Sequence, residues 1–303
     1  MSAIVLMDGG MGQELIARSR HPVHPLWSAF VLLQEPQIVR EVHRDYIEAG
    51  ARVITVNAYA ATGPRLERDG LGGDFAALQE AACRLAHQAR DEAAAEAVLV
   101  AGCLPPLVAS YHPEAVPPQA DALREYRRIV AAQAPHVDLF LCETMSLARE
   151  ARAAAEAAAE SGKPVWVAWT LADEGGTRLR SGETVEDAAA ALDGLPVAAH
   201  LVNCCHPERV DAAMPTLVAL PGPVGAYANA FQSVAQLRIG GTVAALAPRQ
   251  DLGPARYADF AAGWVAGGAR LVGGCCEVGP AHIAAVADRL TGAGHNIVGS
   301  LPC

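Results

Sequence analysis

The chain has 303 residues, of which 52% are hydrophobic and 18% charged, and its formal net charge is −10. This acidic balance, without a cluster of Lys and Arg, argues against nucleic acid and anionic membranes as partners. No apolar stretch reaches the ~20 residues of a membrane-spanning helix, and the N-terminus lacks the basic lead of a signal peptide. We therefore expect a cytoplasmic protein whose eight cysteines are free thiols, metal ligands or nucleophiles rather than a disulfide framework.

Eight short apolar segments are predicted to be strands. Each is rich in β-branched residues or Leu on both faces, as parallel strands are when helices cover both sides of the sheet. They begin near Ala3, Arg52, Val98, Val137, Val165, Ala199, Val224 and Arg270.

Helical sequence lies between these strands. Residues 37–49 carry their apolar side chains on one stripe, and Gly50 follows where a C-terminal cap belongs. Asp74 and Thr184 are predicted N-caps of two further helices. Pro280 suits the first turn of the last helix.

Eight alternations of strand and helix in one chain predict an α/β protein with a (β/α)8 TIM barrel in a single domain, residues 1–303. A doubly wound open sheet is the alternative. The chain has no G-x-G-x-x-G motif after the first strand, which weakens that alternative.

Cysteine pairs follow two of the predicted strands. In a barrel the C-terminal ends of the strands build the active site, and Cys275-Cys276 and Cys204-Cys205 both lie at such ends. Gly273-Gly274 would let the backbone turn so that both Cys275 and Cys276 bind one ion. One cysteine of the other pair would complete a zinc site with three thiolates and an open position, but the spacing does not say which.

The remaining cysteines have simpler interpretations. Cys103 and Cys142 also lie at strand ends, but a lone cysteine there is usually a small buried hydrophobic residue. Cys83 and His87 lie four residues apart on a predicted outer helix and are interpreted as packing residues. Cys303 is at the terminus.

Two acidic residues and a glycine turn complete the predicted active-site rim. Asp8 and Glu143 follow apolar strands, and a carboxylate inside a barrel mouth needs a cationic partner such as the ammonium of an amino acid. Gly9-Gly10 would leave backbone N–H groups open to a carboxylate. Together with a thiophilic metal, these groups indicate a thiol amino acid as ligand.

At this point the sequence resembles the homocysteine S-methyltransferases, most closely the bacterial branch that uses S-methylmethionine. The matching motifs follow the family order over nearly the whole chain, and they are Asp8-Gly-Gly-Met-Gly-Gln-Glu-Leu15, Leu26-Trp-Ser-Ala29, Glu41-Val-His-Arg-Asp-Tyr-Ile-Glu-Ala-Gly-Ala51, Cys142-Glu-Thr144, Val202-Asn-Cys204 and Gly273-Gly-Cys-Cys276.

The resemblance implies a zinc-dependent (β/α)8 barrel that methylates homocysteine to methionine. It implies Zn²⁺ ligands Cys204, Cys275 and Cys276, and it makes Cys205 a varied position. It also implies that homocysteine and the methyl donor are the small-molecule partners. In the family pattern Asp8 and Glu143 hold the ammonium of homocysteine, and the turn Gly9-Gly10 meets its carboxylate. Trp27, Tyr59 and Tyr227 lie near an onium donor, which aromatic rings attract.

The donor and two competing functions remain open. S-methylmethionine is expected first, S-adenosylmethionine second, and betaine or dimethylsulfoniopropionate third. The chain departs from the family around the mouth, at Cys103-Leu-Pro-Pro-Leu107, Tyr227-Ala-Asn-Ala-Phe231 and Glu277. A magnesium or manganese barrel is disfavoured because hard ions do not choose thiolates. The alternatives are a non-catalytic zinc-binding or thiol-redox barrel and a methyltransferase for another thiol.

Overall fold

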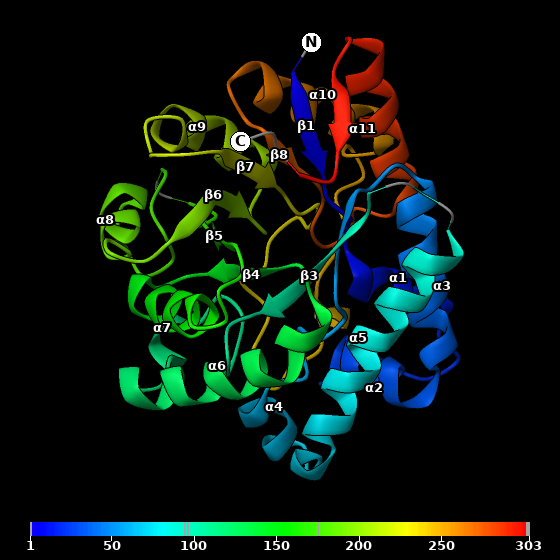
Figure 1. Ribbon diagram of the computed structural model, residues 1–303, viewed down its shortest axis with the longest axis vertical. Helices are drawn as coiled ribbons and strands as arrows, with labels where there is room; N and C mark the ends of the chain where they lie inside the picture. Colours follow the sequence, from blue (N-terminus) through cyan, green and yellow to red (C-terminus); the bar gives the residue numbers. More distant parts are fainter. Residues whose placement is uncertain (1, 94, 96, 175, 301–303) are drawn as a thin grey trace.

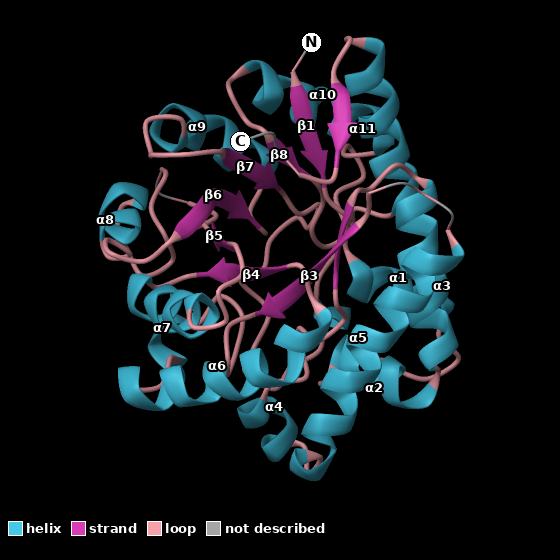
Figure 2. Cartoon of the chain, in the orientation of Figure 1, coloured by secondary structure: helices cyan, strands magenta, loops and turns pink. Residues whose placement is uncertain are grey.

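The structure is a computed structural model that describes residues 2–93, 95, 97–174 and 176–300. Its strands form an inner layer, and the helices lie outside them (Figures 1 and 2). The strands are β1 Ala3–Leu6, β2 Val53–Thr55, β3 Leu99–Leu104, β4 Leu139–Met145, β5 Val165–Trp169, β6 Val197–Asn203, β7 Val224–Tyr227, β8 Leu271–Val272 and β9 Asn296–Val298. The helices are α1 Met11–Arg18, α2 Trp27–Gln34, α3 Pro36–Glu48, α4 Gly63–Arg68, α5 Phe75–Glu92, α6 Gln119–Gln133, α7 Ala148–Ala159, α8 Val185–Ala190, α9 Pro207–Leu217, α10 Pro254–Ala266 and α11 Pro280–Gly292.

The strands form one curled parallel sheet in the order β2-β3-β4-β5-β6-β7-β8-β1-β9. Strands β2 to β8 lie in the sheet in the order in which they follow one another in the chain, with no reversal, so the doubly wound alternative is wrong. A parallel bridge between Met7 and Val53 also links the end of β1 to β2. The architecture is therefore α/β and consistent with a TIM-like barrel.

All eight predicted strands are present, and the structure adds a ninth. The short strand β9 pairs in parallel with β1, with Ala3 opposite Asn296. It has only three residues and comes after the last helix, so it has no place in a strand–helix repeat. Sequence alternation therefore does not predict it.

Most of the predicted helix ends are confirmed. Gly50 follows α3 with φ +109°, Thr184 Oγ1 accepts from Asp187 N at 3.0 Å at the start of α8, and Pro280 is the first residue of α11. Asp74 does precede α5, but its side chain makes no capping hydrogen bond. The reason is that a 3₁₀ turn, Gly72–Asp74, leads directly into α5 and places Asp74 in a helical conformation.

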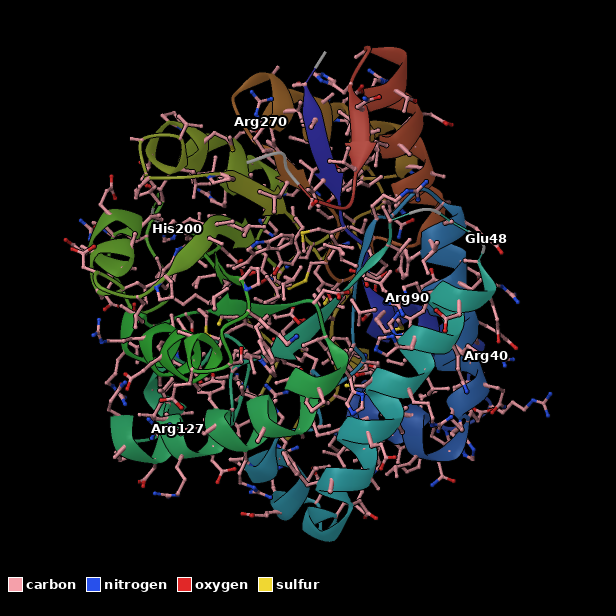
Figure 3. The ribbon with its side chains drawn as sticks, in the orientation of Figure 1. Arg40, Glu48, Arg90, Arg127, His200 and Arg270 are labelled. Atoms are coloured by element: carbon pink, nitrogen blue, oxygen red, sulfur yellow. A yellow bond between two sulfur atoms is a disulfide. The ribbon has the colours of Figure 1, made fainter. Side chains whose placement is uncertain are left out.

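Alternate residues of the strands serve two separate cores. Val5 and Leu141 belong to an inner cluster of strand side chains, whereas Leu6 and Phe140 belong to the larger cluster shared with the helices. This follows from the two-residue period of a strand. Charged side chains such as Arg127 lie on the outside (Figure 3), where Arg127 Nε donates to Glu160 Oε2 at 2.9 Å. No helix within the described residues is long and apolar enough to cross a membrane.

Candidate metal centre and substrate pocket

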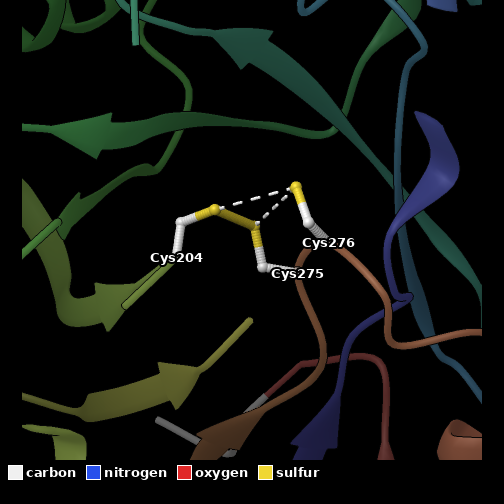
Figure 4. Close-up of side chains that lie close together, drawn as sticks. All are labelled: Cys204, Cys275 and Cys276. Carbon is white, nitrogen blue, oxygen red and sulfur yellow. Dashed lines mark hydrogen bonds between the residues drawn. A yellow bond between two sulfur atoms is a disulfide. The ribbon is translucent and has the colours of Figure 1, made fainter. Parts of the chain in front are cut away.

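Three cysteine sulfurs meet at the C-terminal ends of β6 and β8 (Figure 4). The Sγ atoms of Cys204, Cys275 and Cys276 all lie within 4.8 Å of one another. Cys276 Sγ is 3.9 Å from Cys204 Sγ and 4.0 Å from Cys275 Sγ. Cys204 and Cys275 are joined by a disulfide. The sequence predicts metal ligands here rather than a disulfide. The structure places both residues in the metal-ligand group but also joins them by a disulfide, because the fold brings the two sulfurs into direct contact.

The donor set fits a soft metal ion. Ligand sulfurs at the ~2.3 Å distance of zinc–thiolate bonds lie about 3.8 Å apart around a tetrahedral ion. The two distances from Cys276 Sγ already have this size, and the third pair, Cys204 and Cys275, becomes available as thiolates once its disulfide is reduced. Three thiolates select zinc and similar ions over magnesium or calcium.

Glycines in two turns bring the N-terminal strand against the cysteine pair. A Cβ on Gly10 would lie 2.5 Å from the carbonyl oxygen of Cys275, and one on Gly9 would lie 2.1 Å from that of Val278. Neither distance is possible for a real side chain, so both positions require glycine for close approach of the backbone. The first turn therefore packs directly on the turn that carries Cys275 and Cys276.

Asn203 connects Cys204 to the acidic residue on β4. Asn203 Oδ1 accepts from Thr144 N at 2.9 Å, and its Nδ2 donates to Thr144 Oγ1 at 2.9 Å. Thr144 and Cys204 have positive φ, +61° and +50°, a conformation that costs a non-glycine residue free energy and collects at functional sites. The two motifs that contain Glu143 and Cys204 are thus one physical unit.

A single pocket contains every residue that the sequence analysis proposed for the site. Its empty space measures about 820 Å³, including open solvent at its mouth. The predicted residues that line it are Asp8, Gly9, Gly10, Trp27, Tyr59, Glu143, Cys204, Tyr227, Cys275 and Cys276.

Two carboxyl groups in the pocket lack a cationic partner among the described residues. Asp8 is buried and accepts from Thr55 N at 2.8 Å, and burial raises its pKa to about 8. Glu143 accepts from Cys103 Sγ at 3.0 Å, and burial raises its pKa to about 7. No salt bridge of either group occurs in the described part of the chain. An ammonium group between them would restore their ionised forms.

The glycine turn offers fewer free donors than the sequence suggests. Gly10 N donates to the carbonyl oxygen of Val278 at 2.9 Å, so it is not open to a ligand. The expectation is wrong for that N–H because the close packing of the two turns uses it. Gly10 is instead the N-cap of α1, and Gly12 in its first turn also lines the pocket. The N-terminal end of a helix attracts anions.

Aromatic side chains cover the other side of the pocket. Trp27 packs edge to face on Tyr59, with ring centroids 6.0 Å apart. The hydroxyl of Tyr227 is buried and has no hydrogen-bond partner among the described residues. The guanidinium of Arg65 lies 5.3 Å from the ring centre of Tyr59, so one face of that ring already has a cation near it.

Two further aromatic residues line the pocket and were not proposed from the sequence. Tyr111, in the loop after β3, donates its hydroxyl to Cys204 Sγ at 3.0 Å. Phe231, in the loop after β7, is buried against Cys204 and Cys276. Tyr111 lies far along the loop from the end of β3, so the rule that active-site residues lie at the C-terminal ends of the strands does not identify it. Phe231 belongs to a stretch that differs from the family motif.

The other cysteines do not join the sulfur cluster. Cys103 and Cys142 are buried, as are Cys83 and Cys205, and none of these four belongs to the metal-ligand group of the described residues. Cys303 lies outside the described residues.

The chain is similar to known proteins over nearly its whole length. The family model described as homocysteine S-methyltransferase matches residues 5–290. A curated relative, the homocysteine S-methyltransferase of Escherichia coli, is 34% identical over 94% of this chain and 95% of its own. A selenocysteine methyltransferase of Astragalus bisulcatus is 26% identical over 91% of this chain and 89% of its own.

Solved structures of a homocysteine methyltransferase have a similar fold. The Escherichia coli homocysteine methyltransferase MmuM superposes with a TM-score of 0.79 in its metallated form, with 33% identity over 94% of this chain and 96% of that chain. Its oxidized form has the same TM-score, 0.79. The match of the family model over most of the chain, together with the identity to the bacterial enzyme, shows that this chain belongs to the homocysteine S-methyltransferase family of enzymes.

Proposed function

We propose that this protein transfers a methyl group from an onium donor to the thiol of homocysteine in a zinc-dependent reaction that gives methionine. One observation carries the proposal: three cysteine sulfurs cluster in the same pocket as two carboxyl groups that have no cation paired with them in the described chain. A thiol amino acid offers one group to each of these features.

Cys204, Cys275 and Cys276 would hold the ion in their reduced state. Zinc, when bound, would supply the positive charge that keeps a substrate thiol deprotonated at neutral pH. Tyr111 donates its hydroxyl to Cys204 Sγ and thereby orients this sulfur within the pocket. Phe231 packs on the cysteines and excludes water from them.

Asp8 and Glu143 would bind the ammonium of homocysteine. Both carboxyl groups face the pocket, and the ammonium would replace the water that each loses on burial. The carboxylate of homocysteine would lie at the start of α1, beside Gly9 and Gly10, where the helix dipole favours an anion. Anchoring both ends of the amino acid holds its thiol at the sulfur cluster.

The methyl donor would occupy the aromatic side, beside Trp27, Tyr59 and Tyr227. These rings suit a sulfonium or quaternary ammonium through cation–π attraction. S-methylmethionine is the first candidate, ahead of S-adenosylmethionine and of betaine or dimethylsulfoniopropionate. Because a neutral thioether or amine leaves from an onium centre, the chain needs no general acid, and positioning supplies much of the acceleration.

We also propose that the sheet closes as a (β/α)8 barrel and that residues 1–303 form one domain. The bridge between Met7 and Val53 supports closure, because it joins β1 to β2, the two strands that a closed barrel brings together. A hydrogen bond from Asp8 N, just after β1, to Val53 O in β2 at 2.9 Å also supports closure.

A related acceptor is the second candidate. The Astragalus relative is named for methylation of selenocysteine, and a selenol would suit the same soft metal. Selenocysteine is shorter than homocysteine by one methylene, so the distance between the ammonium site and the sulfur cluster would decide between them. Activity with each acceptor measures this directly.

The test is methyl transfer by the reduced, zinc-loaded protein. Homocysteine should be converted to methionine with at least one onium donor of the panel named above. Metal analysis of the same preparation should give one zinc per chain. Stoichiometric zinc without methyl transfer from any donor would support a non-catalytic zinc-binding barrel in place of the enzyme.

A further inference from the structure

A second chamber opens beside the substrate pocket, and three arginines line it. Arg65 and Arg68 come from α4, and Arg238 comes from the loop after β7. No acidic side chain is among its lining residues in the described structure. Trp27, on the aromatic side of the substrate pocket, lines both cavities, as do Ser110, Leu237 and Val243.

Arg65 is a buried cation that has no paired carboxylate among the described residues. The residue is buried, with an exposed fraction of 9%. Its Nη2 donates to Pro106 O at 2.8 Å and to Ser110 Oγ at 3.4 Å, while its Nε has no partner. Within the described residues, no carboxylate oxygen lies within 4.0 Å of its guanidinium.

The surroundings of Arg65 raise the free energy of its charge. Burial lowers its pKa, and the charge of Arg68 adds to this effect, whereas Tyr59 and Glu150 oppose it. A guanidinium removed from water is stabilised by a hydrogen-bonded anion. The unused donors of Arg65 therefore suit an anion that arrives with a ligand.

The other two arginines would add to this anion site. Arg238 is exposed and has no salt bridge among the described residues. Arg68 Nη2 lies 2.7 Å from Asp69 Oδ2, so its charge is partly balanced. A Cβ on Gly240 would lie 3.6 Å from Arg68 Nε, so the loop that carries Arg238 packs on Arg68. The fold thus brings cations from two distant segments to one chamber.

We propose that this arginine chamber binds the carboxylate of the methyl donor, and that the enzyme therefore selects zwitterionic donors, in which an onium centre and a carboxylate belong to one molecule. The proposal rests on the methyl transfer proposed above. Three guanidinium groups repel a donor that carries only a positive charge. In a zwitterion the carboxylate meets the arginines, while the onium centre lies beside Trp27 and the sulfur cluster.

The carboxylate of homocysteine is not the expected occupant. The chamber lacks Asp8, Glu143 and all three clustered cysteines among its lining residues, so it does not reach the proposed ammonium and thiol positions. It adjoins the substrate pocket only through Trp27, Ser110, Leu237 and Val243. This is the side on which the donor is proposed to bind.

The test compares S-methylmethionine with its primary amide, which keeps the sulfonium and loses the carboxylate. With the reduced, zinc-loaded enzyme and homocysteine, we expect kcat/KM for the amide to be lower by roughly 10- to 100-fold, the size of a lost charge-assisted contact. Arg65→Met should lower kcat/KM for S-methylmethionine by a similar factor and change that of the amide little. The ratio between the two donors should therefore approach one.

Matched variants separate this effect from a general loss of structure. Arg124→Met removes an exposed arginine on α6, which pairs only with Asp121 in the described chain, and it should leave the donor ratio unchanged. Arg238→Met removes an exposed side chain and should reduce the ratio even if Arg65→Met does not fold. Equal use of the two donors by the unmodified enzyme would overturn the proposal, as would an unchanged ratio in both Arg65→Met and Arg238→Met.

Calorimetric binding keeps this proposal distinct from the proposed function. S-methylmethionine should bind the unmodified protein more tightly than its amide does, by the same factor of roughly 10 to 100. Methyl transfer without any preference for the carboxylate would overturn the arginine chamber alone. Absence of transfer from every donor would overturn the proposed function, and equal affinities for acid and amide would then overturn the chamber as well.

Discussion

Replacement of Glu143 by Gln should weaken homocysteine binding and change its pH dependence. The substitution keeps the shape of the side chain and removes the charge proposed to meet the ammonium. A hydrogen bond to a charged group contributes about 1.5–3 kcal/mol, which corresponds to roughly a 10- to 150-fold increase in KM for homocysteine. The KM for the methyl donor should change much less.

The pH dependence follows from the raised pKa of Glu143. Burial raises this pKa to about 7, and only the ionised carboxylate attracts an ammonium. Ionisation rises from about one tenth at pH 6 to about nine tenths at pH 8, so kcat/KM for homocysteine should rise about tenfold from this group alone. In Glu143→Gln this contribution disappears, and the remaining rise should follow Asp8, whose pKa burial raises to about 8.

The assay is initial-rate methyl transfer at saturating donor from pH 6 to pH 8.5. Comparison of variant and unmodified enzyme at each pH cancels the titration of homocysteine itself. Glu160→Gln, on the outer surface where Glu160 pairs with Arg127, is the matched control and should behave like the unmodified enzyme. An unchanged KM for homocysteine in Glu143→Gln, or an unchanged pH profile, would refute the assigned role.

Three further changes have definite expected outcomes. Cys275→Ala should abolish both zinc retention and methyl transfer, whereas the control Cys83→Ala should retain one zinc per chain. Both quantities are measured by metal analysis and an activity assay after gel filtration. Stoichiometric zinc with normal turnover in Cys275→Ala would contradict the metal site. Asn203→Ala removes both hydrogen bonds to Thr144 and leaves a buried N–H unpaired. The free energy of unfolding, measured with urea, should therefore fall by about 1–3 kcal/mol. An unchanged free energy of unfolding would mean that this pair of residues does not hold the site together. His43→Leu removes a buried imidazole whose two nitrogens have no partner among the described residues, and the free energy of unfolding should rise by about 1–3 kcal/mol. Burial lowers the pKa of His43 in the folded protein to about 3. The unmodified protein therefore loses stability from this group as the pH falls below about 6.5, because the unfolded chain then binds a proton that the folded chain does not. An equal loss of stability with falling pH in His43→Leu would exclude His43 as the cause.

The disulfide between Cys204 and Cys275 makes metal binding depend on reduction. Protein prepared without a reducing agent should bind less zinc than protein treated with one, because two of the three ligand sulfurs are bonded to each other. Thiol titration before and after reduction, alongside zinc content, measures both quantities. Equal zinc content with the disulfide intact would show that the ion does not need these two sulfurs.

Local sequence determined the strands and the position of the site. Alternation of short apolar segments with helical stretches is a property of neighbouring residues, so β1 to β8 were predictable. The C-terminal ends of parallel strands must share one edge, so the sequence alone predicts that Asp8, Glu143 and cysteines of both pairs lie close together. The pocket contains Asp8, Glu143, Cys204, Cys275 and Cys276. The family resemblance, on its motifs, then selected Cys204 from its pair.

Tertiary structure decided what depends on backbone direction and on segments that are distant in the chain. Cys204 joins the cluster and Cys205 does not, because Cys204 has φ +50° and points its sulfur toward Cys275 and Cys276. Gly10 loses its free N–H to Val278 only because two distant turns pack together. Arg65, on α4, and Arg238, in the loop after β7, line one chamber because the fold brings these two distant segments together. The spacing of residues along the sequence does not predict such contacts, because they depend on how the whole sheet curls.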